Sequence, residues 1–213
     1  MLDVHTTSSE LVGHDEYGHS SDNLNANSQS AMMKVFIGGS RKVSVLSSEV
    51  RQRLDEMLAK HMPIVIGDAP GVDKSVQQYL HSRGYRDVEV FCSGTRCRNN
   101  VGNWPIRQVP VDSNKRDFEF YATKDLRMSG EASIGLMIWD GKSAGTLMNV
   151  LRLTKQNKKV VIFEAPKHRF LELESESEWT DFFSTCDDEI KLRIEKLSGT
   201  ASKVTAPIQA SLL

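Results

Sequence analysis

The chain has 213 residues, enough for one domain with a decorated periphery, and its 27 lysine and arginine residues almost balance its 28 aspartate and glutamate residues. This balance argues against a protein that binds nucleic acid through its overall charge, so nucleic acid is not expected as a partner. No apolar run has the length of a membrane helix and the N-terminus lacks a signal-peptide core, so we expect a soluble, cytoplasmic protein without membrane contact.

Cysteine usage predicts reduced thiols. Cys92, Cys97 and Cys186 are odd in number, and the spacing of the first two is not that of a usual zinc pair. We therefore expect neither a disulfide framework nor a metal site, and no cofactor is implied.

The two ends of the chain differ in composition from its middle. Residues 1–31 are polar, rich in serine, asparagine, histidine and aspartate, and lack hydrophobic periodicity, which predicts a disordered N-terminal extension. The predicted domain spans residues 32–166. A helical appendage at 167–197 and a flexible tail at 198–213 are expected to follow it.

Short apolar runs alternate with segments of helical periodicity through the middle of the chain. The first run, MKVFIG at 33–38, ends in glycine as a buried parallel strand does, and similar runs follow at 63–68, 87–92, 132–139 and 159–165. Predicted helices lie at 47–62, 73–83, 118–131 and 146–158, and the acidic stretch 171–197 predicts one or two peripheral helices. Strands and helices that alternate in this way form right-handed βαβ units. The expected fold class is therefore α/β, a Rossmann-like open parallel sheet of about five core strands with helices on both faces.

The segment 93–117 interrupts this alternation, since it holds arginines, glycines, prolines and Trp104 without a clear period. A loop of this length inside a compact domain is usually functional or mobile. It could fold over a ligand, with Arg96 or Arg98 on a phosphate and Trp104 stacked on a base. It could equally pack at a subunit interface, where the same residue types are enriched, and the sequence leaves both alternatives open.

The candidate site consists of the loops that follow the strands, because ligands of an open parallel sheet bind beyond the carboxyl ends of its strands. Three of these loops are rich in glycine, which lets backbone N–H groups approach an anion, and helix N-termini add unpaired donors. The candidate binding residues are Gly38, Gly39, Ser40, Arg41, Gly67, Asp68, Gly71, Asp73, Gly141, Lys142, Ser143, Gly145 and Thr146. Neither GGSRKVSV nor DGKSAGT has the spacing of an established nucleotide fingerprint, so an ATPase is not expected.

Three motifs in this order, FIGGSR, GDAPGVDKSVQQYL and KDLRMSGEASIGLMIWDGKSAGT, resemble the SLOG superfamily of Rossmann-like proteins, which is related to DprA/Smf and to the LOG nucleotide hydrolases. The resemblance covers residues 33–165 and is nearest to small bacterial members of largely unassigned function. It implies a nucleotide-type small molecule as the ligand. The loop from Gly141 to Thr146 would hold its phosphate, the loop from Gly38 to Arg41 would line the opposite wall, and the loop from Gly67 to Asp73 would lie near the sugar.

The sequence departs from the LOG enzymes at two positions. Lys124 stands where they have an arginine, and Asn149 stands where they have a glutamate that can stabilise charge at an N-glycosidic bond. Asp140, at a strand end in the same loop, is the best substitute carboxylate, so Asp140 and Lys124 are the candidate catalytic residues. An Asx-turn is the alternative role of Asp140.

The missing glutamate favours a nucleotide sensor or binding protein over an N-glycosidic bond hydrolase or transferase. A DNA-handling role like that of DprA is disfavoured, because the sequence has no basic stripe. The apolar helix positions Met128, Leu147 and Leu151 predict a homodimer or higher homo-oligomer, and coverage of the sheet is their alternative role.

Overall fold

The computed structural model describes residues 33–111 and 118–204. The predicted N-terminal extension, 1–31, and the end of the predicted tail, 205–213, lie outside the described residues. The first part of that tail differs from its prediction, because helix α6 (Asp188–Val204) continues through residues 198–204.

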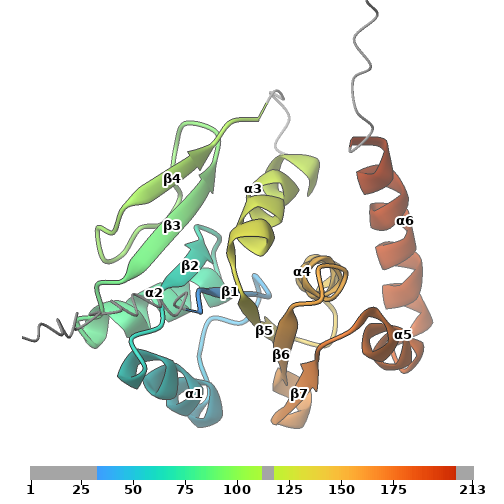
Figure 1. Cartoon of the computed structure of the whole chain (residues 1–213), viewed down its shortest axis with the longest axis horizontal. Coiled ribbons are helices and arrows are strands. Elements are labelled where there is room, and N and C mark those ends of the chain that lie inside the picture. Colours follow the sequence, from blue (N-terminus) through green and yellow to red (C-terminus); the bar gives the residue numbers. More distant parts are fainter. Residues whose placement is uncertain (1–32, 112–117, 205–213) are drawn as a thin grey trace, which may run out of the picture. The chain divides into compact units, whose positions relative to one another are not determined.

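A sheet of seven strands runs through the described residues in the order β4-β3-β2-β1-β5-β6-β7 (Figure 1). Its strands are β1 (Val35–Gly39), β2 (Ile64–Gly67), β3 (Val88–Ser93), β4 (Ile106–Val109), β5 (Ile134–Trp139), β6 (Lys159–Glu164) and β7 (Arg169–Leu173). Neighbouring strands are parallel except for β7, which is antiparallel to β6. The chain adds strands to one side of β1 and then, from β5 on, to the other, so the topological switch point lies between β1 and β5. The predicted α/β class and Rossmann-like sheet are confirmed.

The edge strands β4 and β7 are absent from the prediction. In β4 the side chains of Ile106, Arg107 and Gln108 are exposed, and in β7 Arg169 and Glu172 are exposed. A buried parallel strand needs apolar side chains on both faces, whereas an edge strand can carry polar ones. Neither segment therefore has the apolar run by which the five central strands are recognised.

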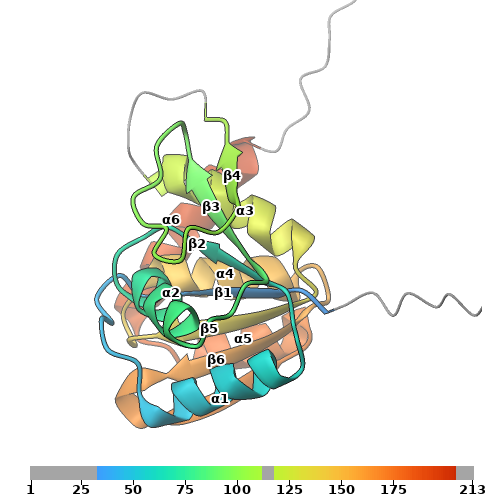
Figure 2. The ribbon, with the colours of Figure 1, turned by 90° about the vertical axis from the view of Figure 1, so that its left-hand side faces the viewer.

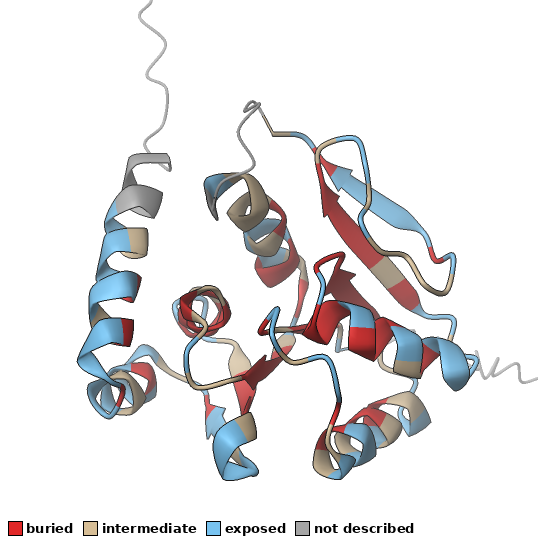
Figure 3. Cartoon of the chain, turned by 180° about the vertical axis from the view of Figure 1, so that it is seen from behind, coloured by how far each residue is buried: buried red, intermediate tan, exposed pale blue. Residues whose placement is uncertain are grey.

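Helices cover both faces of the sheet (Figure 2). One face packs against α1 (Ser48–Ala59) and α2 (Val72–Ser82), and the other packs against α3 (Phe118–Glu131) and α4 (Ala144–Thr154). Successive side chains of β1 alternate between the two faces of the sheet. Val35 and Ile37 belong to the core under α1 and α2, and Phe36 belongs to the core under α3 and α4. Figure 3 shows the resulting band of buried residues along the central strands.

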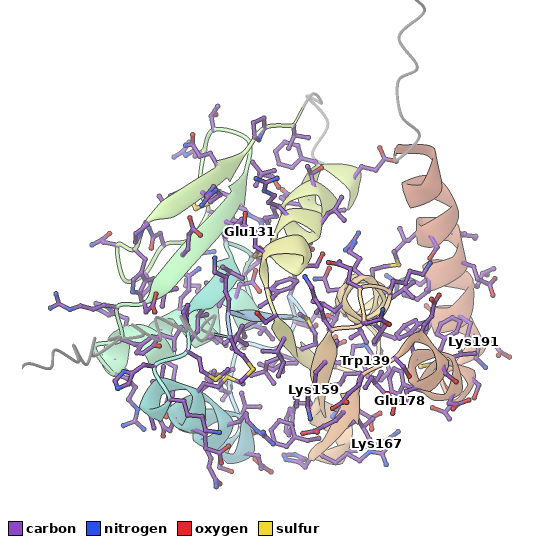
Figure 4. The ribbon with its side chains drawn as sticks, in the orientation of Figure 1. Glu131, Trp139, Lys159, Lys167, Glu178 and Lys191 are labelled. Atoms are coloured by element: carbon purple, nitrogen blue, oxygen red, sulfur yellow. A yellow bond between two sulfur atoms is a disulfide. The ribbon has the colours of Figure 1, made fainter. Side chains whose placement is uncertain are left out.

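The predicted helical appendage consists of β7, α5 (Glu176–Ser184) and α6, and α5 and α6 pack against α4. A 3₁₀ turn (Ala165–Lys167) links it to β6. Trp139, which ends β5 and is labelled in Figure 4, packs edge-on against Phe182 of α5 with 5.8 Å between ring centroids. No helix within the described ranges is long and apolar enough to cross a lipid bilayer.

Candidate functional site

A cleft of about 660 Å³ opens beyond the carboxyl ends of β1 and β5, at the switch point of the sheet. The predicted binding residues that line it are Gly38, Gly39, Ser40, Arg41, Asp73, Gly141, Lys142, Ser143, Gly145 and Thr146. Lys124 and Asp140 also line it. Gly67 and Gly71 do not, and Asp68 instead lines a second cavity of about 620 Å³.

Asp140 holds the loops of β1 and β5 together. Its Oδ1 accepts hydrogen bonds from the amides of Lys142 (3.1 Å) and Ser143 (2.8 Å), and its Oδ2 accepts one from the Ser40 hydroxyl (2.7 Å). Partial burial acts to raise the pKa of Asp140, but these hydrogen bonds outweigh it and hold the pKa below its ordinary value. Oδ1 thus has the Asx-turn role that was the alternative to catalysis, and Oδ2 ties this loop to Ser40 in the loop of β1.

The first turn of α4 points into the cleft. The Ser143 hydroxyl caps this helix by accepting hydrogen bonds from the Thr146 amide (3.4 Å) and the Thr146 hydroxyl (3.0 Å). A Cβ at Gly145 would meet no atom within 4 Å, so packing does not require a glycine there. The missing side chain leaves the positive end of the helix dipole open to the cleft.

Gly71 positions the β1 loop. It has a φ of +79°, and a side chain there would collide with the backbone of Arg41. The neighbouring Val72 amide donates a hydrogen bond to the Ser40 carbonyl oxygen (3.1 Å). This close approach fixes the loop against the start of α2. The Arg41 guanidinium lies over the Tyr121 ring of α3, 4.7 Å from the ring centroid.

Arg98 reaches the same tyrosine ring from the long loop, with its guanidinium 4.3 Å from the Tyr121 centroid. Asp68 holds it there. The Arg98 side chain donates to both Asp68 oxygens (2.5 and 3.0 Å), and its amide donates to Oδ2 (3.0 Å). Burial acts to raise the pKa of Asp68, but the contacts with Arg98 prevail and lower it. Asp68 therefore anchors the long loop that follows β3. Its side chain lines the second cavity rather than the cleft, where a sugar was expected.

A buried charge cluster forms the floor of the cleft. Lys124 is 4% exposed and its ammonium lies 2.6 Å from Oδ1 of Asp125. Burial acts to lower the pKa of Lys124, but Asp125 and Asp73 outweigh it, so the pKa is raised and the lysine stays charged. Burial, Asp125 and Asp68 raise the pKa of Asp73 to about 6, and Lys124 opposes them.

Asn149 belongs to the edge of this cluster. Its amide nitrogen donates to Asp125 (3.4 Å), and its oxygen accepts a hydrogen bond from Arg152 (2.6 Å). The position at which the resemblance expects a glutamate is therefore occupied by a side chain with two structural partners.

Trp104 differs from its prediction. It is 7% exposed and its indole nitrogen donates to the Tyr85 carbonyl oxygen (3.0 Å), so its ring packs inside the protein and faces neither a ligand nor a partner subunit. An aromatic side chain that sequence reasoning missed, Tyr121, also lines the site. The available signal was its place three residues before Lys124 on one helix, since residues with this spacing share a face.

The cysteines also differ from their prediction, because Cys92 of β3 and Cys97 of the long loop that follows it form a disulfide. The free thiol among the described residues is Cys186, which is buried. The two bonded sulfur atoms and Asp68 lie within 4.8 Å of one another, a grouping that can suit a metal ion. Here the sulfur atoms form a disulfide and Asp68 forms an ion pair with Arg98, so each of the three groups already has a partner within the protein.

No family model and no curated protein matches the sequence. The structure of DNA processing protein A (DprA) from Streptococcus pneumoniae is similar, with 15% identity, a TM-score of 0.46, and coverage of 62% of this chain and 50% of that one. A DprA structure from Helicobacter pylori, described as giving insight into single-stranded DNA binding, has 15% identity, a TM-score of 0.47, and coverage of 79% of this chain and 81% of that one. This chain thus spans half the length of the pneumococcal one, and the likeness concerns the fold.

Two predictions are contradicted by these structures. A nucleotide-type small molecule as ligand, with an N-glycosidic bond enzyme as the alternative, is wrong, and so is the exclusion of nucleic acid. The similar structures are DNA processing proteins, one of them described with single-stranded DNA. The physical reason is that a net charge of −1 over the whole chain does not describe the local charge at the mouths of the cavities.

Proposed function

We propose that this chain binds single-stranded nucleic acid across the carboxyl edge of its sheet. The observation that carries the proposal is the stack at Tyr121, a half-buried ring with the Arg41 guanidinium at 4.7 Å and the Arg98 guanidinium at 4.3 Å. Tyr121 lines both cavities. Proteins that hold single strands combine cations that contact the phosphates with planar groups on which bases stack. Here Arg41 supplies a cation without an ion pair to a described carboxylate, and the stack of guanidinium groups on Tyr121 supplies the planar surface.

The rim of the cleft supplies further cations. Arg41, Lys42 and Lys142 are exposed and line the cleft, and no described carboxylate forms an ion pair with any of them. Their charge is therefore available to phosphate oxygens. The open N-terminus of α4 at Gly145 supports the same use, because it allows close approach of an anion to the backbone.

Two of the acidic residues near the site are compensated by a neighbouring cation. Asp68 is paired with Arg98 and Asp125 is paired with Lys124, whereas Asp140 keeps its charge and accepts three hydrogen bonds from uncharged donors. Asp187 and Glu189 line the cleft at its α6 end and are exposed. A bound single strand of nucleic acid would therefore run from the cleft over Tyr121 toward the second cavity, in the direction away from α6.

An unpaired strand fits this arrangement better than a duplex. The faces of duplex bases are stacked on one another, so a tyrosine ring can reach a base face only where the strand is single. The contacts expected here are with phosphates and base faces, which occur in every sequence. We therefore expect weak dependence on the overall sequence and strong dependence on salt.

Fluorescence anisotropy with labelled oligonucleotides of about 12–16 nucleotides tests the proposal, with the matching duplex as competitor. Arg41→Ala and Tyr121→Ala should each raise the dissociation constant for the single strand about five- to thirtyfold, since a stacked base or a cation–π contact is worth about 1–2 kcal/mol. The matched control is Arg83→Ala, which removes a guanidinium that lies 5.0 Å from the Tyr79 centroid at the end of α2. Equal affinity of wild type and both site variants, or a preference for duplex, would contradict the proposal.

A further inference from the structure

A second cavity of about 620 Å³ lies beyond the ends of β3 and β4, beside the start of α3. Its lining includes Ser93, Gly94, Thr95, Arg96, Phe120 and Tyr121. Figure 2 shows β3 and β4 beside α3 at this side of the sheet. The cavity shares Tyr121 with the cleft at the switch point, so one tyrosine side chain stands between the two spaces.

The walls of this cavity suit a flat aromatic group. The rings of Phe120 and Tyr121 are 5.1 Å apart at an interplanar angle of 82°, so they offer one face and one edge at nearly a right angle. Gly94 has a φ of +72°, and a Cβ there would lie 3.2 Å from the tip of the Phe120 ring. The glycine thus lets the loop backbone lie close to the aromatic wall.

The wall of the cavity also holds a buried polar group without a partner among the described residues. Ser93 is 6% exposed, and its hydroxyl forms no hydrogen bond with any described residue. Buried hydroxyl groups are nearly always hydrogen-bonded in folded proteins, so an unpartnered one beside a cavity points to a group that arrives with a ligand. One cationic side chain of the lining has no compensating charge, because Arg96 is exposed and forms no ion pair with a described carboxylate.

We infer that this cavity receives one base of the bound single strand. The base stacks against the aromatic wall, its polar edge hydrogen-bonds to the Ser93 hydroxyl, and the adjoining phosphate stays outside near Arg96. A serine hydroxyl can donate or accept, so the contact fixes the position of a base without choosing its identity. This inference rests on the proposed function, because it assigns the second cavity to the same strand that crosses Tyr121.

An abasic scan of one oligonucleotide tests the inference. A single abasic residue is placed at each position in turn, and the affinity of the wild-type protein is measured by anisotropy. One position should be far more sensitive than its neighbours, with affinity lowered about tenfold by loss of the inserted base. Ser93→Ala should lower the affinity for the intact strand about two- to tenfold and reduce the penalty at that one position.

Stability measurements separate this role from a structural one. Ser93→Ala removes a hydroxyl that has no partner, so its unfolding temperature should equal or exceed that of wild type while its affinity falls. The matched control is Ser75→Ala, a buried serine whose hydroxyl donates to the Ser44 carbonyl oxygen (2.8 Å), which should lose stability and keep its affinity. Ser93→Val, which fills part of the cavity, should bind more weakly than Ser93→Ala.

The outcomes distinguish the two proposals. A sensitive position that Ser93→Ala desensitises supports the base cavity. Binding with a flat abasic profile, and full affinity in Ser93→Ala and Ser93→Val, overturns the base cavity and leaves the proposed function in place. No binding of any single strand by wild type overturns both.

Discussion

Replacement of Lys124 by methionine should destabilise the protein strongly at neutral pH and much less in acid. Methionine keeps most of the volume of the side chain and removes its charge. Lys124 is 4% exposed, lies 2.6 Å from Asp125, and also compensates the charge of Asp73. Removing one partner of a buried ion pair leaves an uncompensated charge and costs about 3–5 kcal/mol.

The expected size of the effect follows from this figure. Each kcal/mol lowers the unfolding temperature of a chain of this size by roughly 2–4 °C, so the variant should melt roughly 6–20 °C below wild type at pH 7. Lys124 is the group that opposes the burial of Asp73, whose pKa is already raised to about 6. Without the lysine that pKa rises further. Asp73 in the variant is then more fully protonated at pH 5 than at pH 7, and the loss of stability should be smaller at pH 5.

Urea unfolding at the two pH values measures both quantities. The control is Lys159→Met, which removes a lysine paired with Glu172 and Glu174 at the surface and should change the free energy of unfolding by less than about 1 kcal/mol. A loss below about 1 kcal/mol for Lys124→Met at pH 7 would refute the charge argument. So would a large loss that is the same at both pH values, because only packing would then be at stake.

Three further predictions concern salt, pH and thiols. In Arg41→Ala the slope of log affinity for a single strand against log salt should fall by about 0.7, the value for one lost phosphate contact, and an unchanged slope would place Arg41 off the strand. Folded Asp73 binds its proton more tightly than the unfolded chain does, so its contribution to stability is full below the ordinary carboxyl pKa of 3.8 and is lost as the pH rises through the folded pKa of about 6. Asp73→Asn should therefore flatten the free energy of unfolding between these pH values, and an unchanged profile would count against burial as the cause. A thiol reagent in denaturant should find one thiol, from Cys186, before reduction and three after it, whereas three before reduction would contradict the Cys92–Cys97 bond.

The central sheet is predictable because burial on both faces demands apolar side chains in every strand, as in Val35, Phe36 and Ile37 of β1. The same criterion does not detect the edge strands, because their side chains are partly exposed. Ile106 at the start of β4 is half exposed, and its neighbours Arg107 and Gln108 are exposed too. Such a strand is held by main-chain pairing with β3, which leaves no trace in the hydrophobic pattern.

The location of the cleft is predictable for a related reason. The carboxyl ends of parallel strands meet at one edge, so Ser40 and Asp140 come within 2.7 Å although one hundred residues separate them. The direction of each side chain is a different matter. Asp68 is directed toward Arg98 of the long loop, and Trp104 is directed inward to the Tyr85 carbonyl oxygen, because each forms a hydrogen bond with a partner distant in the sequence. Loop positions alone contain no information on such pairs.

Whole-chain charge misleads here for a physical reason. A charge acts on a partner only within about a Debye length of ~8–10 Å and only to the extent that no neighbour compensates it. Asp68 and Asp125 count fully in the net charge of −1, yet each is paired with a cation inside the protein. Arg41 and Lys42 count equally and lie at the rim without an ion pair to any described carboxylate. A chain with balanced composition can therefore present a cationic edge to a phosphate backbone, and exclusion of nucleic acid requires the local arrangement of charges rather than their sum.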